Sequence, residues 1–61
     1  MSQPQNTNKV MTIGEVSEFL KIPVSTLYVL AQQGRLRGAK FGRQWRFLEE
    51  DILNHFRSQR L

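Results

Sequence analysis

A run of cationic side chains between residues 37 and 46 has the chemistry needed to bind phosphate. It contains Arg37, Lys40, Arg43 and Arg46, with Gln44 between the last two arginines and no acidic residue. Guanidinium and ammonium groups bind phosphate oxygens, and arginine also enters the narrow minor groove of A·T-rich DNA. We interpret the run as a DNA contact. The alternative is a charged strand edge that only prevents aggregation.

A second candidate surface carries small polar side chains and lies earlier in the chain. Its residues are Ser25, Thr26, Tyr28 and Val29. On a helix with Leu27 facing the core, steps of about 100° per residue turn these side chains outward or to the flanks. Hydroxyl groups bind phosphate oxygens or base edges, and valine can meet a thymine methyl group. The pattern favours a helix that reads the major groove. The alternative is a solvated helix face.

The composition excludes most other functions. The chain has 61 residues, which suffice for one small domain and are too few for most enzymes. It has no cysteine and one histidine, His55, so we expect no catalytic residue, no metal site and no cofactor. Nine Lys and Arg against five Asp and Glu give a net charge of +4, which favours a polyanionic partner. No apolar run is long enough for a membrane span or a signal peptide, so we expect a cytoplasmic protein.

The first helix is predicted to follow a polar N-terminal segment. Residues 1–10 are predicted to be a flexible tail, because almost no apolar side chain occurs there. Thr12 and Glu15 then form a capping box, in which each side chain binds the backbone N–H of the other residue. A helical apolar face follows, which ends near residue 20 or 21 and consists of Ile13, Val16, Phe19 and Leu20.

The second helix is predicted to begin at Pro23, since proline suits the first turn of a helix. Its buried stripe consists of Leu27, Leu30 and Ala31. Gly34 falls where a left-handed residue would cap the helix end. Because only two residues separate the two helices, they must cross steeply, as in a helix-turn-helix.

From Leu36 to Phe47 apolar and polar residues alternate, which predicts a β-hairpin. A two-residue turn at residues 42–43 would pair Phe41 with Gln44, whereas a three-residue loop over residues 42–44 would place Phe41 and Trp45 on one face. We expect the longer loop, because it keeps the aromatic side chains together, and we expect Trp45 to serve the core.

A third helix begins near residue 49, with acidic residues in its first turn and arginines near its end, as the helix dipole favours. Its apolar face consists of Ile52, Leu53 and Phe56. The predicted domain spans residues 11–58, and residues 59–61 form a frayed end. The fold class is α+β and mostly helical: a helix-turn-helix, a two-stranded hairpin as wing, and a C-terminal helix.

Five strings in the chain resemble a known family: Thr12-Ile-Gly-Glu-Val, Ser25-Thr-Leu-Tyr, Gly34-Arg-Leu, Phe41-Gly-Arg-Gln-Trp-Arg-Phe and Glu50-Asp-Ile. They are similar to the excisionase-type, MerR-like winged helix-turn-helix DNA-binding domains, and the resemblance extends from about residue 11 to residue 56. The string from Phe41 is the most specific, because it joins a turn glycine, arginines and core aromatics in one short segment.

The resemblance implies that the second helix reads the major groove through Ser25, Thr26 and Tyr28. It also implies that the wing touches the DNA backbone and the minor groove through Arg43, Gln44 and Arg46. Many relatives carry Ser or Thr at the position of Pro23, so no contact is transferred to that residue. The resemblance does not cover the dimerising helix and effector domain of full MerR regulators, so sensing of a metal or drug is not implied.

We therefore expect a protein that binds double-stranded DNA and is associated with the nucleoid. It would act either as a recombination directionality factor that bends attachment-site DNA or as a small transcription regulator. The expected partners are further copies bound on adjacent sites, a recombinase or RNA polymerase. The alternative is an interaction module that docks on an acidic protein. RNA binding ranks third, because the hairpin is expected to expose no aromatic side chain for stacking on unpaired bases.

Overall fold

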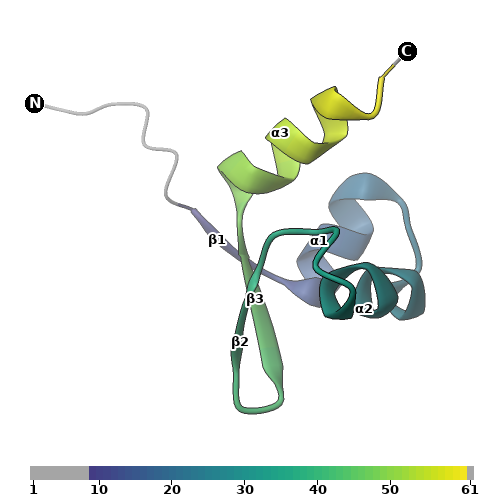
Figure 1. The fold of residues 1–61 in the computed structure, drawn as a ribbon. Coiled ribbons are helices and arrows are strands. Elements are labelled where there is room, and N and C mark those ends of the chain that lie inside the picture. The colour runs from purple at the N-terminus through teal and green to yellow at the C-terminus, as the bar shows by residue number, and fades with distance from the viewer. Residues whose placement is uncertain (1–8, 61) are drawn as a thin grey trace, which may run out of the picture.

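Six elements follow one another in a computed structural model that describes residues 9–60. They are β1 (Val10–Thr12), α1 (Ile13–Leu20), α2 (Val24–Gln32), β2 (Ala39–Phe41), β3 (Gln44–Leu48) and α3 (Glu49–Ser58). The hairpin of β2 and β3 projects beyond the helices, on the side opposite α3 (Figure 1). The predicted fold class is confirmed: the domain is a mostly helical winged helix-turn-helix.

Both ends of α1 are fixed by hydrogen bonds of local residues. The predicted capping box is present, since the Glu15 N–H donates to the Thr12 hydroxyl at 3.1 Å and the Thr12 N–H donates to the Glu15 carboxylate at 2.8 Å. At the other end Lys21 has a left-handed conformation with φ 61°, and the Ile22 N–H donates to the Ser17 carbonyl at 3.1 Å. The Ser17 hydroxyl donates to the Ile22 carbonyl at 2.6 Å. These bonds make a rigid turn between α1 and α2.

The start of α2 differs by one residue from the prediction. Pro23 is the N-cap and not the first helical residue, and its carbonyl accepts from the Leu27 N–H at 3.2 Å. The predicted left-handed cap at the other end is confirmed, because Gly34 has φ 75°. The Gly34 N–H donates to the Ala31 carbonyl at 3.0 Å and the Arg35 N–H to the Leu30 carbonyl at 2.9 Å, the two bonds of a Schellman motif.

The sheet has three antiparallel strands in the order β1-β3-β2, one strand more than predicted. Val10, placed at the end of the predicted tail, pairs with Leu48, and Met11 pairs with Phe47. The Glu49 N–H donates to the Lys9 carbonyl at 2.9 Å, so the backbone before β1 supplies a partner for the start of α3, which has no side-chain cap. The rest of the predicted tail, residues 1–8, and Leu61 lie outside the described residues.

The prediction of a three-residue hairpin loop is wrong. Phe41 pairs with Gln44, so the turn contains only Gly42 and Arg43. Gly42 has φ 65°, and Arg43 is not among the residues with positive φ, which is the sign pattern of a type II′ turn. Such turns match the right-handed twist of the strands they join, and glycine supplies the positive φ without strain. Turn geometry therefore outweighs the grouping of aromatic side chains.

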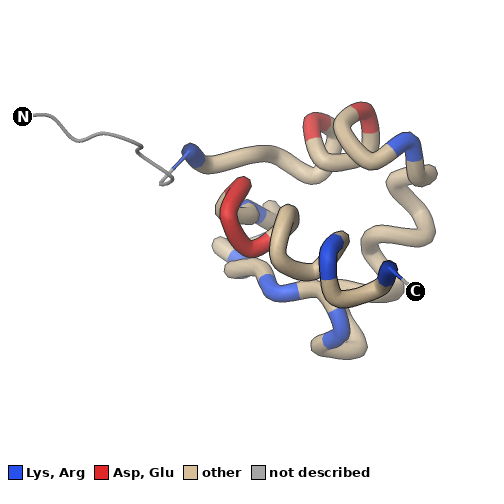
Figure 2. Tube along the Cα trace, turned by 90° about the horizontal axis from the view of Figure 1, so that it is seen from above, with Lys and Arg blue, Asp and Glu red and all other residues tan. Residues whose placement is uncertain are grey.

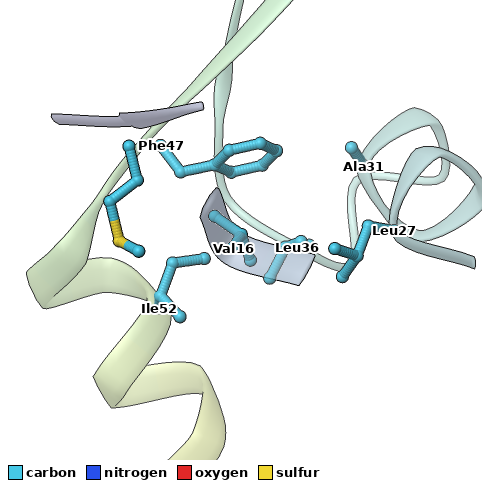
Figure 3. Close-up of a cluster of buried hydrophobic side chains, with 7 residues drawn as sticks. Val16, Leu27, Ala31, Leu36, Phe47 and Ile52 are labelled. Carbon is cyan, nitrogen blue, oxygen red and sulfur yellow. The ribbon is translucent and has the colours of Figure 1, made fainter. Parts of the chain in front are cut away.

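The core lies between the sheet and the three helices (Figure 3). Its buried residues are Met11, Val16, Leu27, Ala31, Leu36, Phe47 and Ile52. Two residues expected on buried helix faces are exposed, Phe19 by 44% and Phe56 by 52%. A domain of this size has too few neighbouring elements to cover the whole apolar face of each helix. Trp45 is half-buried and packs against the core from the hairpin.

Candidate nucleic-acid interface

The outward surface of α2 contains the residues predicted for base reading. Leu27 is fully buried, and Ser25, Thr26, Tyr28 and Val29 are all exposed. No acidic residue lies in the first turn of α2. The predicted orientation of the helix is therefore confirmed. It follows from the left-handed turn at Lys21, which ends α1 and lets α2 set off in a new direction with Leu27 in the core.

The wing, residues 39–48, presents different side chains on its two faces. Strand residues alternate between faces and directly paired residues share one. Lys40 and Trp45 are paired, and they share a face with Phe47, which is buried against the helices. We call this the inner face. The opposite, outer face contains Phe41, Gln44 and Arg46. Lys40 and Arg46, two cations of the same run, therefore lie on opposite faces of the wing.

Arg46 has a defined position on the outer face. Its guanidinium donates to the Gln44 side-chain oxygen at 3.0 Å and to the Trp45 carbonyl at 2.9 Å. Arg43 occupies the second turn position and is exposed at the tip of the wing. Arg37 is exposed in the loop between α2 and β2. The wing therefore has a fixed cation on one face, an exposed one at its tip and Lys40 on the other face.

Most basic positions lie apart from the acidic residues of α1, although Lys9 and Lys21 are near Glu15 and Glu18. In Figure 2 the acidic residues of α1 lie along one edge, and most of the basic positions lie toward the opposite edge. The other acidic cluster occupies the first turn of α3 and consists of Glu49, Glu50 and Asp51. The loop after α2 and the wing contribute cations and no acid between residues 33 and 48. The resulting field favours a polyanion on the side of the wing and α2.

The comparison with protein families agrees with this geometry. The model of a family described as a helix-turn-helix domain matches residues 10–60. The chain belongs to this helix-turn-helix family. The family is excisionase-like, and this match indicates that the chain is a DNA-binding helix-turn-helix protein. No curated protein and no solved structure matches it significantly.

The helix-turn-helix domain also has an apolar groove that the sequence did not reveal. It has a volume of about 420 Å³ and lies on the outer face of the sheet, where Val10 is exposed by 56% and Phe41 by 60%. Leu48 lies beside Val10 in the register, and Arg37 and Arg46 line the groove. The expectation that the hairpin exposes no aromatic side chain is therefore wrong. The short turn is the cause, because it directs Phe41 away from the core.

Two further observations concern metal binding and membrane-spanning helices. Within residues 9–60, no group of three or more His, Cys, Asp or Glu residues could hold a metal ion. No helix in this part of the chain has the length and hydrophobicity to cross a membrane.

Proposed function

We propose that the chain binds double-stranded DNA in a sequence-specific way through α2 and the wing together. The observation that carries the proposal is the outward orientation of α2 beside a projecting, acid-free hairpin (Figure 1). The major groove is about 12 Å wide and admits a helix, and a hairpin beside the helix can reach the neighbouring minor groove. Because the fold fixes α2 and the hairpin relative to each other, the helix can occupy the major groove while the hairpin occupies the neighbouring minor groove.

We assign direct reading to α2. Ser25 and Thr26 lie in its first turn, where a recognition helix most often reaches base edges. Tyr28 and Val29 extend the same surface, the first with a hydroxyl group for a phosphate and the second with methyl groups for thymine. These contacts carry sequence information because base edges differ in the major groove.

We assign positioning on the backbone and in the minor groove to the wing and the loop before it. The residues are Arg37, Lys40, Arg43, Gln44 and Arg46. A hairpin in the minor groove has a DNA strand on either side, so cations on both of its faces can meet phosphates. The division of Lys40 and Arg46 between the inner and outer faces fits such a position.

Two biological roles fit this surface, and both act by occupying DNA. One is that of an excisionase, a recombination directionality factor that bends attachment-site DNA beside a recombinase. The other is that of a small transcription regulator that meets RNA polymerase. In either role the chain works on the nucleoid in the cytoplasm. A single small module buries only about 600–1,000 Å² on DNA, so we propose that several copies bind cooperatively on adjacent sites.

A salt titration tests the proposed function. If about five cationic groups meet phosphates, log K for a duplex falls with log salt at a slope of about −4 to −5. The affinity is measured by fluorescence anisotropy of a labelled duplex at several salt concentrations. A response that does not depend on salt removes the DNA-binding proposal.

The outer groove favours a second candidate function, docking on an acidic protein. Its floor is apolar and its charged lining residues are Arg37, Arg46 and Asp51, so two cations stand against one acid and an apolar segment with carboxylate groups would fit. Phe41→Ser separates the two functions. It removes the most exposed apolar side chain of the groove, so it weakens docking on such a protein and leaves the affinity for a duplex within about twofold.

A further inference from the structure

Trp45 contributes an indole N–H, a hydrogen-bond donor, to the wing. Its ring stacks on Phe47 with centroids 6.1 Å apart and planes inclined by 15°. Trp45 stays half-buried, and none of the hydrogen bonds within residues 9–60 uses its indole N–H. Tryptophan N–H groups usually have an acceptor when they are buried, so a partner that covers this half-buried ring would need to supply one.

Lys40 lies directly opposite Trp45 on the neighbouring strand. Side chains of such pairs share a face, with Cβ atoms about 4.5–5.5 Å apart. Lys40 is exposed, and its ammonium makes none of the side-chain hydrogen bonds found in the described part of the chain. One small patch of the inner face thus offers an ammonium group and an indole N–H. Both are donors, which suits an anionic oxygen.

The inner face of the wing is the face that packs on the helical part of the domain, where α1 and α3 contact β3 directly. Phe47 shares this face and points into the core, toward Leu27 and Ala31 of α2 (Figure 3). Trp45 is two residues nearer to the tip, at the edge of the same packing. When α2 lies in the major groove and the wing in the minor groove, one DNA strand passes between them. That strand presents its phosphates to the inner face of the wing.

We propose that Lys40 and Trp45 form a phosphate clamp on the DNA strand that separates the two grooves. The indole N–H donates to a phosphate oxygen, and the Lys40 ammonium neutralises the charge. The stack on Phe47 occupies one side of the indole ring and limits its rotation. The clamp rests on the proposed function, and it explains how the wing and α2 hold a single strand from both sides.

Conservative variants test the clamp with the full chain. Trp45→Phe keeps an aromatic ring on Phe47 and removes the N–H, and Lys40→Gln removes the charge. Arg57→Gln is the matched control, because it removes a cation from α3, on the side of the domain opposite the wing. Thermal unfolding shows that each variant is folded. Affinity for one duplex is then measured at several salt concentrations.

We expect Trp45→Phe to weaken duplex binding about tenfold without changing the salt slope, as loss of a hydrogen bond to a charged group does. Lys40→Gln lowers the magnitude of the salt slope by about one, and the Arg57→Gln control binds like the original chain. Because Trp45 is the only tryptophan, its fluorescence gives a second readout. Bound duplex is expected to protect the indole from quenching by iodide.

The outcomes separate the clamp from the proposed function. If the original chain binds duplex with a steep salt dependence while Trp45→Phe and Lys40→Gln bind equally well, the clamp is wrong and the proposed function stands. Unchanged iodide quenching on the duplex also overturns the clamp. If the original chain shows no salt-dependent duplex binding, both proposals fail.

Discussion

Lys40 on β2 lies directly opposite Trp45 on β3, and this pairing determines what each face of the wing presents. A shift by one residue would exchange the two faces, because side chains alternate along a strand. With the observed register, Trp45 extends the core toward the tip and Phe41 lies exposed on the outer face. The turn at Gly42 thus determines which side chains the inner and the outer face of the wing present.

Gly38 is predicted to be essential for packing of the wing against the core. A Cβ atom at Gly38 would lie 2.5 Å from the Phe47 ring, and Phe47 is only 1% exposed. Gly38→Ala must displace this ring, so we expect a loss of roughly 1–3 kcal/mol in the free energy of unfolding. Urea unfolding followed by circular dichroism measures it.

Gly14→Ala is the matched control for Gly38→Ala. A Cβ atom at Gly14 would meet only the Thr12 hydroxyl, at the ordinary distance of 3.8 Å. Alanine favours the helix more than glycine does, so we expect a gain of roughly 0.5 kcal/mol. Equal losses for the two variants would contradict the close approach of Gly38 to Phe47.

The capping box is predicted to stabilise the junction between β1 and α1. Thr12→Ala removes the acceptor for the Glu15 N–H, so we expect a loss of about 1 kcal/mol in the free energy of unfolding. Thr12→Ser retains a hydroxyl group and should stay close to the original stability. If Thr12→Ser is as unstable as Thr12→Ala, the loss comes from the methyl group and not from the cap. Thermal unfolding of the two variants distinguishes these results.

We predict that α2 determines which DNA sequences are preferred and that the wing contributes affinity that does not depend on sequence. Arg43→Ala should weaken binding to all duplexes alike and lower the magnitude of the salt slope by about one, because a phosphate contact carries no sequence information. Thr26→Ala should change the ranking of duplexes that differ in one base pair. Affinities for a panel of single-base variants of one duplex give both results. A uniform loss for both substitutions would defeat this division of roles.

Sequence patterns predicted the helices well because their signals are local. The Thr12 and Glu15 capping box, the glycine at position 34 and the spacing around Leu27 each specify a conformation within one or two turns. The outward residues of α2 follow directly from that spacing. The string from Phe41 to Phe47 indicates the family from the sequence alone.

The sheet was predicted less well, because its pairing depends on distant residues. β1 has only three residues, too few for an alternating pattern, and pairing with β3 defines it. The hairpin register depends on a turn preference that competes with the apparent benefit of burying Phe41. The positions of Lys40 and Trp45 on the inner face follow from that register, so the sequence alone did not reveal them.

Methylation protection by dimethyl sulfate tests most directly whether α2 and the wing grip one duplex together. The reagent attacks guanine N7 in the major groove and adenine N3 in the minor groove, so one experiment reports on both grooves. A duplex selected from a random pool for tight binding is used. We predict protected guanine N7 positions in one stretch and protected adenine N3 positions about five base pairs away, half a helical turn. Protection confined to one groove would contradict simultaneous binding of one duplex by α2 and the wing.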